Sequence, residues 1–257
     1  GHYQGVIHIN FSGKYSTQPV ITKYNKSNGL PDNVDNYVFQ VSGRIYFATP
    51  KGIFRFEETR QRFLPDSTFG TDFSDGSRRV FNMTQDANGK IWAYSQNKPG
   101  FFSLNKEGKY IWEETPFLRL VNFTIATIYP DSSDVVWFGG ADGLYRYNPR
   151  FEKKYNQKFP VLIRKVTTLE DSLVFGGYLA NKSGNIKELS YINNDLRFEY
   201  AIPSFDDISA NRFQHYLEGF DNHWSRWTDE TKAVYTNIPE GNYVFRVKSK
   251  NIYGQIS

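Results

Sequence analysis

Hydrophobic and polar residues alternate with a period of two over many short stretches of this chain. In "GLYRYN", which begins at Gly143, Tyr145 and Tyr147 fall on one side and Arg146 on the other. Such alternation predicts half-buried β-strands, because successive side chains of a strand point to opposite faces. Three further stretches share the pattern: "GVIHIN" at Gly5, "GIFRFE" at Gly52 and "GFFSLN" at Gly100.

The four stretches recur at intervals of 43–48 residues. A second strand-like stretch precedes three of them ("RIYFAT", "KIWAYS" and "VVWFGG"), with Tyr46, Trp92 or Trp137 at the shared aromatic position. Each pair predicts a hairpin with a short Gly-containing link, with Gly143 at the positive-φ position of "GGADG". Further strand-like stretches lie upstream, so each unit of about 45 residues holds about four strands. That is typical of a β-propeller blade, with Trp92 and Trp137 in the blade core.

After Pro149 the repeat stops, and a polar, basic stretch predicts a linker. Five strand-like segments follow: "VLIRKVTTL", "LRFEYAI", "RFQHYLEGF", "KAVYTNI" and "NYVFRVKSKN". Several short strands without a helical period predict an immunoglobulin-like or fibronectin-like β-sandwich. In the last segment Tyr243 and Phe245 are expected to point inward and Lys248 outward. His215 is expected to be an exposed strand residue.

The composition agrees with an all-β fold. Aromatic residues make up 18% of the chain, and rings pack well on a pleated surface. The absence of cysteine excludes disulfides, thiolate metal sites and cysteine nucleophiles. The net charge of +4 is spread along the chain, so no nucleic-acid partner is expected. No apolar run approaches the ~20 residues of a membrane-spanning helix.

Two stretches resemble known families. "VVWFGGADGLYRYNP" resembles the two-component-regulator propeller repeat. "YLEGFDNHWSRWTDETKAVYTNIPEGNYVFRVKSKNIYG" resembles the Y_Y_Y domain, which follows such repeats in periplasmic sensor regions of hybrid histidine kinases. The resemblance makes Tyr243 a candidate tyrosine corner, whose hydroxyl bonds back to upstream backbone. Residues that carry the Y_Y_Y pattern include Tyr216, Gly219, Trp224, Tyr235, Gly241 and Tyr243.

From these patterns we predict three parts. Residues 1–149 form the C-terminal blades of a partial propeller, about three blades plus the end of a preceding one. Residues 150–158 form a linker, and residues 159–257 form the Y_Y_Y sandwich without its last strand. We therefore expect the sequence to be a piece of a larger sensor, with its membrane segments outside the chain.

Candidate chemistry is sparse, and no catalytic residue, metal ligand or cofactor site is expected. The "GGADG" stretch leads into a strand and lacks the Lys-Ser/Thr of a phosphate-binding loop. No pair of His has metal-ligand spacing. The acidic pairs are sequence neighbours, which would point to opposite faces of a strand rather than flank a sugar. Trp112, His223 and Trp227 are the candidate ligand-binding residues, because sugars stack on aromatic rings.

The resemblance implies a non-enzymatic, periplasmic sensor region. Such a region would bind an oligosaccharide, form a homodimer through the sandwich and relay the signal to a cytoplasmic kinase. Two alternatives stay open. The chain could belong to a carbohydrate-processing enzyme with accessory propeller and sandwich modules, or to a protein–protein interaction scaffold.

Overall fold

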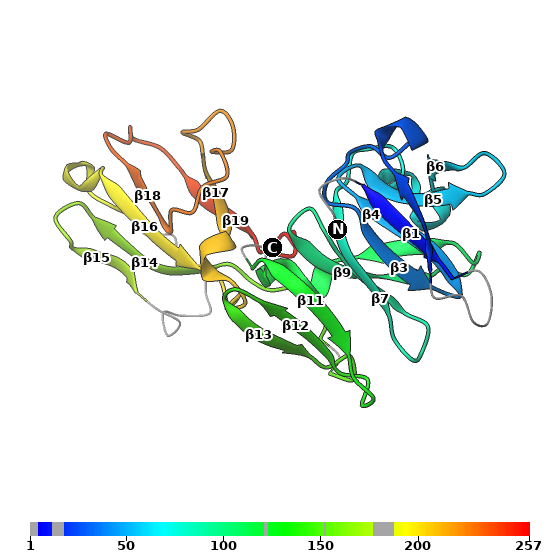
Figure 1. Cartoon of the computed structure of the whole chain (residues 1–257). Coiled ribbons are helices and arrows are strands. Elements are labelled where there is room, and N and C mark those ends of the chain that lie inside the picture. Colours follow the sequence, from blue (N-terminus) through cyan, green and yellow to red (C-terminus); the bar gives the residue numbers. More distant parts are fainter. Residues whose placement is uncertain (1–4, 12–17, 121–122, 152, 177–187) are drawn as a thin grey trace. The chain divides into compact units, whose positions relative to one another are not determined.

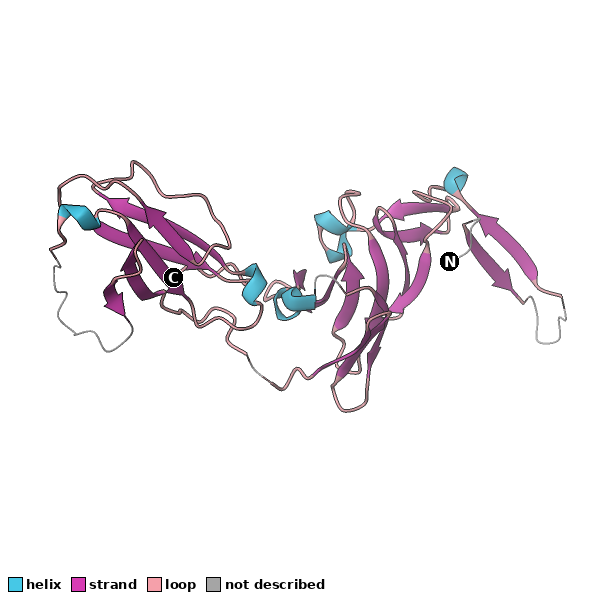
Figure 2. Cartoon of the chain, turned by 90° about the vertical axis from the view of Figure 1, so that its left-hand side faces the viewer, coloured by secondary structure: helices cyan, strands magenta, loops and turns pink. Residues whose placement is uncertain are grey.

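The computed structural model describes residues 5–11, 18–120, 123–151, 153–176 and 188–257. The chain divides into two compact units, Gly1–Lys153 and Lys154–Ser257. Strands dominate both units, and the described helices are 3-10 turns of three to six residues (Figure 2). The all-β fold class predicted from the sequence is confirmed. No helix in these ranges is long and apolar enough to cross a membrane.

The first unit consists of antiparallel sheets whose strands follow one another in sequence order (Figure 1). β1 (Val6–Asn10) pairs with β2 (Val20–Tyr24). The next sheet contains β3 (Tyr37–Val41), β4 (Arg44–Thr49), β5 (Gly52–Glu57) and β6 (Arg62–Pro65). It is followed by β7 (Val80–Gln85), β8 (Ile91–Ser95), β9 (Lys98–Leu104) and β10 (Tyr110–Glu113). The last sheet contains β11 (Ile125–Pro130), β12 (Val136–Gly140) and β13 (Gly143–Tyr147).

The hairpin links differ between the repeats. Gly140 pairs with Gly143 in the β12–β13 hairpin, and Gly143 has the positive φ (126°) predicted for it. In the β8–β9 hairpin the prediction of a Gly-containing link is wrong. Ser95 pairs with Lys98, so the link holds only two residues and neither is glycine. The two link residues, Gln96 and Asn97, themselves adopt positive φ of 49° and 61°. These angles suit the tight two-residue turn between twisted strands.

Neighbouring sheets pack through both faces of their middle strands. On β8, Ile91 and Ala93 enter the core shared with the β3–β6 sheet. Trp92 and Tyr94 enter the core shared with the β11–β13 sheet, and Trp92 is only 1% exposed. Trp92 therefore lies in the predicted blade core. Trp137, at the same repeat position, is only partly buried, because its side of β12 faces away from the β7–β10 sheet.

Hydrogen bonds also join the sheets, and they connect positions about one repeat apart. The partners are Asp35 with Arg79, Ser42 with Gln85, Asn82 with Ala126, and Asn88 with Asp134, at separations of 43–46 residues. These hydrogen bonds thus follow the spacing of the repeat, although different residue pairs form them at each interface.

The second unit is a two-layer sandwich. One layer has the strand order β15 (Leu173–Gly176), β14 (Leu162–Thr168), β16 (Leu196–Ala201) and β18 (Lys232–Tyr235). The other pairs β17 (Arg212–Glu218) with β19 (Val244–Lys250). Phe198 and Tyr200 from the first layer and Phe213 and Leu217 from the second share one core. The second unit thus has the two-layer β-sandwich that the sequence predicted.

The ends of this unit are tied to its sheets. Tyr155, one of the residues predicted as linker, packs its ring against Tyr253 with centroids 5.0 Å apart. Near the other end, the backbone of Asn251 bonds to Gln255 in a turn, and Ile256 forms a bridge with Lys250 on β19.

Candidate functional site

The outer face of the β17–β19 pair gathers basic side chains. The register places Arg212 opposite Lys250, Gln214 opposite Lys248, and Tyr216 opposite Arg246. Residues that alternate along a strand share a face. Because Phe213 and Leu217 belong to the core, these six side chains lie on the outer side.

The loop after β17 folds back along this strand. The backbone nitrogen of Ser225 donates to the carbonyl of His215 at 3.0 Å, and Thr228 exchanges two backbone hydrogen bonds with Phe213. The Ser225 hydroxyl also accepts a hydrogen bond from the His215 backbone nitrogen. This pairing adds an edge to β17 and brings Trp224 and Trp227 to the basic side chains.

The two Trp rings hold two lysine ammonium groups. The Lys248 nitrogen lies 4.3 Å from the centroid of Trp224 and 5.7 Å from that of Trp227. Lys250 lies 4.9 Å from the Trp227 centroid. The Trp224 ring also stacks on Tyr216 at 5.7 Å with an interplanar angle of 30°. Cation–π contacts of this length stabilise the ammonium positions.

The balancing negative charge on this surface is small. Glu218 pairs with Arg246 at 2.6 Å. Among the residues that the structure describes, no carboxylate lies within 4.0 Å of the Lys248 or Lys250 nitrogen. The basic face of this unit consists of Arg212, Gln214, Tyr216, Arg246, Lys248 and Lys250, together with Trp224 and Trp227.

A polar relay lies beneath the basic face. The Tyr235 hydroxyl donates to Asp221 Oδ2 at 2.7 Å and lies 2.8 Å from His215 Nδ1. Because the hydroxyl has one proton, Nδ1 of His215 is the donor in the second contact. Asp221 Oδ2 also accepts from the Leu217 backbone nitrogen at 2.7 Å. The relay thus ties the start of the Trp-bearing loop to β17 and β18.

The burial of this relay shifts two pKa values. Burial raises the pKa of Tyr235 far above its usual value, and the hydrogen bond to Asp221 adds to the shift. Burial lowers the pKa of His215, while the charge of Asp221 acts in the opposite direction. The prediction that His215 is exposed is wrong. Its ring lies on the inner side of β17, against Phe245 and Tyr235.

The predicted tyrosine corner is present. The Tyr243 hydroxyl donates to the Pro239 carbonyl at 2.9 Å. A Cβ added at Gly241 would lie 3.1 Å from that hydroxyl, and one added at Gly219 would lie 2.9 Å from the Asn242 carbonyl oxygen. The two glycines therefore let the loops close around the corner.

Residues 204–256 match the family model of the Y_Y_Y domain. The chain contains a Y_Y_Y domain. The basic face, the relay and the tyrosine corner all lie within the matched residues.

Beyond the Y_Y_Y domain, two comparisons cover more of the chain. It is 25% identical over 177 residues to "Histidine kinase P4" of Formosa agariphila, a match that covers 67% of this chain and 13% of that protein. A solved structure, the extracellular domain of a putative hybrid two-component system from B. thetaiotaomicron, aligns with a TM-score of 0.50 at 20% identity. This alignment covers 95% of the chain and 33% of the solved one. The predicted resemblance to proteins of two-component systems is confirmed.

The three predicted ligand-binding residues belong to different units. Trp227 is on the basic face of the Y_Y_Y domain, and His223 is exposed in the same loop. Trp112 belongs to the first unit, where its ring packs against Phe73 and Phe102. Its indole nitrogen donates to Glu114 at 2.9 Å. Trp112 thus has the contacts of a residue at the edge of a core.

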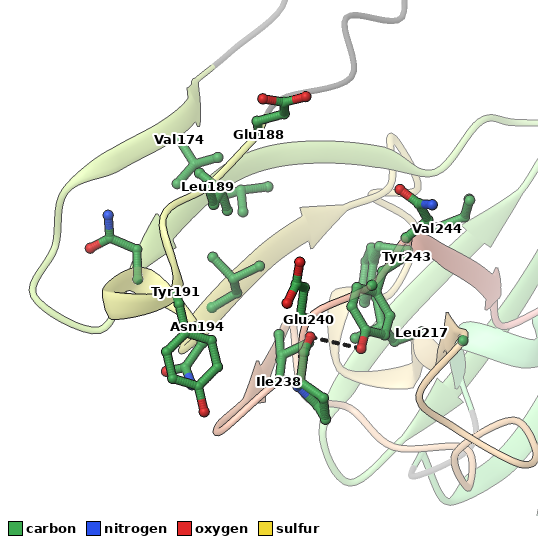
Figure 3. A pocket seen from close by; sticks show the side chains of 18 of the residues that line it. Val174, Glu188, Leu189, Tyr191, Asn194, Leu217, Ile238, Glu240, Tyr243 and Val244 are labelled. Carbon is green, nitrogen blue, oxygen red and sulfur yellow. Dashed lines mark hydrogen bonds between the residues drawn. The ribbon is translucent and has the colours of Figure 1, made fainter.

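The second unit also has a cavity of about 1730 Å³, which opens between the two layers of the sandwich (Figure 3). Its floor is made of core side chains, among them Phe198, Leu217 and Phe245. Two tyrosines line the cavity: Tyr191 is the first residue of η5 (Tyr191–Asn193), and Tyr243 directly precedes β19. Glu188 and Glu240 supply negative charge at the rim. This cavity therefore differs in charge from the basic face.

Three carboxylates from the neighbouring acidic pairs have structural roles. Glu113 accepts a hydrogen bond from the Thr115 backbone, and Glu114 holds Lys98 at 2.7 Å. Asp207 caps the turn η6 (Ile208–Ala210). Within the described ranges, no group of three or more His, Cys, Asp or Glu could hold a metal ion.

Proposed function

We propose that this chain is an extracytoplasmic, periplasmic ligand-sensing part of a hybrid two-component histidine kinase. The proposal rests on the order of the parts along this chain, together with its similarity to a histidine kinase. Repeated antiparallel sheets precede a Y_Y_Y domain, in a chain 25% identical to Histidine kinase P4 over 177 residues. The kinase itself would lie outside these 257 residues, and the chain would have no catalytic activity.

We further propose that the ligand is an oligosaccharide. The aromatic and hydrogen-bonding side chains of the basic face support this class. Tyr216, Trp224 and Trp227 supply partly exposed rings. Gln214 supplies an amide oxygen, since its amide nitrogen donates to the Ser225 carbonyl at 2.7 Å. Apolar surfaces combined with a few placed polar groups are typical of small-ligand sites.

To transmit a signal, the receptor would need two arrangements, and the ligand would have to bind one of them more tightly than the other. We propose a homodimer through the Y_Y_Y sandwich as the element that changes. Analytical ultracentrifugation of the chain, with and without the bound sugar, measures whether the monomer–dimer equilibrium shifts.

Autophosphorylation of the full-length protein in membrane vesicles tests the sensor proposal. Oligosaccharides from a polysaccharide panel are added outside, and the phosphorylated histidine is measured. At least one sugar should change the rate severalfold, and the sugar should remain intact. Release of smaller sugars would favour the carbohydrate-processing enzyme instead, and no response to the whole panel would reject oligosaccharide sensing.

A further inference from the structure

We propose that the basic face of the Y_Y_Y domain selects acidic oligosaccharides, whose sugars carry carboxylate or sulfate groups. This inference rests on the proposed function and names the class of ligand. Its first support is a charge imbalance. The face presents Arg212, Arg246, Lys248 and Lys250, and Glu218 is the one carboxylate in salt-bridge contact with them in the described part of the chain. Arg212 also donates to the carbonyls of Ser209 and Asn211, so among the described residues the two lysines are the cations without such partners.

The second support is that the two lysines are held in place without an anion. Lys248 rests on Trp224 and Lys250 on Trp227. A lysine loses rotamer freedom when it binds an anion, and a contact that already fixes the side chain lowers this entropic cost. An incoming carboxylate or sulfate would therefore meet ammonium groups that are already in position.

The third support concerns the faces of the Trp224 ring. Tyr216 stacks on this ring, and Lys248 lies over it. A neutral sugar that stacks on the part of the Trp224 ring covered by Tyr216 or Lys248 must displace that neighbour. An anionic group can instead bind the ammonium and leave both contacts intact.

The spacing of the cations suits a chain of charged sugars. Lys248 and Lys250 are two residues apart on β19, which separates their Cα atoms by ~7 Å. Arg212 lies opposite Lys250 on β17. A polymer with a charge at regular intervals can contact several of these cations at once.

The ring environment argues against insertion into a lipid surface. Trp224 and Trp227 are only partly exposed, and lysine ammonium groups lie over both rings. Interfacial tryptophans need an apolar ring that reaches the headgroup region. A soluble acidic glycan fits the observations better than a membrane.

Calorimetry with matched sugars tests this inference on the 257-residue chain. The probes are hexagalacturonate and its fully methyl-esterified form, which keeps the sugars and removes the charge. A carrageenan hexamer and its desulfated form make a second pair. We expect a charged member to bind at least about tenfold more tightly than its neutral partner, with affinity that falls as salt screens the charges.

Substitutions at the two lysines test whether the charged probe binds at the basic face. Lys248→Gln with Lys250→Gln should weaken binding of the charged probe by about tenfold or more. Lys248→Arg with Lys250→Arg should retain most of the affinity. The matched control is Arg164→Gln with Lys232→Gln, which removes two charges from exposed positions on the other sheet. This control should change the affinity by less than about twofold.

The outcomes separate the two proposals. If neutral sugars bind or activate the kinase and charged ones do not, this inference is overturned and the sensor proposal stands. Equal binding of the charged probe to Lys248→Gln/Lys250→Gln also overturns it. Binding of phosphatidylglycerol vesicles, but not acidic sugars, through these lysines would assign the face to lipid. If no sugar of any kind binds or activates, both proposals fail.

Discussion

The indole nitrogen of Trp92 donates a 2.8 Å hydrogen bond to the carboxylate of Asp86. The other oxygen of Asp86 accepts hydrogen bonds from the backbone of Asn88 and Lys90, which form the turn between β7 and β8. One carboxylate thus fixes both a turn and the largest side chain of the adjacent core. The next sheet repeats the arrangement with Asp131 and Trp137 at 3.1 Å.

Replacement of Asp86 by alanine should destabilise the β7–β10 sheet. The Trp92 side chain is 1% exposed, so its N–H would lose its acceptor in a buried setting at a cost of about 1–3 kcal/mol. Hydrogen–deuterium exchange of β7 and β8 measures the effect. Asp131→Ala is the matched control and should cost less, because water can reach the partly exposed Trp137. Equal effects of the two changes would contradict this account.

The His215 relay predicts a pH dependence of stability. The folded pKa of His215 lies below its ordinary value of 6.5, so the unfolded chain binds more protons between these two values. The free energy of unfolding should therefore fall as the pH drops from about 6.5 to the folded pKa, and this contribution should then level off. NMR titration of His215 gives the pKa directly. His215→Gln should flatten the profile, whereas a change of the exposed His223 to Gln should not.

Removal of the Tyr243 hydroxyl should weaken the tyrosine corner. Tyr243→Phe loses the hydrogen bond to Pro239, which is worth about 0.5–1.5 kcal/mol. Thermal unfolding of the Y_Y_Y unit measures the loss. Tyr216→Phe is the control, since its hydroxyl has no hydrogen-bond partner among the described residues. If Tyr243→Phe unfolded at the same temperature as the parent, the hydrogen bond of the tyrosine corner would contribute nothing to stability.

Alanine at Gly100 should disturb the position of Trp112. A Cβ there would lie 2.4 Å from the Trp112 ring and 2.7 Å from the Glu113 carbonyl oxygen. Crowding of this kind costs about 1–3 kcal/mol. Tryptophan fluorescence and the unfolding midpoint of the first unit report it. A Cβ at Gly139 would lie 3.0 Å from the Thr127 methyl group and 3.8 Å from a Leu144 methyl group, so Gly139→Ala should be milder.

Much of the fold was readable from local pattern. Period-two alternation found many strands of both units, because the buried side of a strand must be apolar. It did not single out β2, β6, β10 or β15. The hydrogen bond of Tyr243 was predicted from the family resemblance rather than from alternation. The turn at Gln96 and Asn97 was missed, since neither residue is glycine and the strand pairing alone imposes their positive φ.

The site was harder to predict, because it depends on long-range placement. Alternation placed Lys248 on the outer side of its strand, yet nothing in the spacing placed Trp224, 24 residues earlier, beneath it. His215 was misjudged for a related reason. Its burial comes from Phe245 and Tyr235, which lie on other strands.

The hydrogen bonds between neighbouring sheets connect positions 43–46 residues apart, which matches the length of one repeat. A tandem duplication of one whole unit would therefore keep the spacing at which these contacts form, although the residue pairs themselves differ from one interface to the next. Loss or gain of a few residues inside a unit would instead move donors away from their acceptors. Gene rearrangement in such a chain is thus expected to add or delete complete units, with length changes confined to the loops between strands.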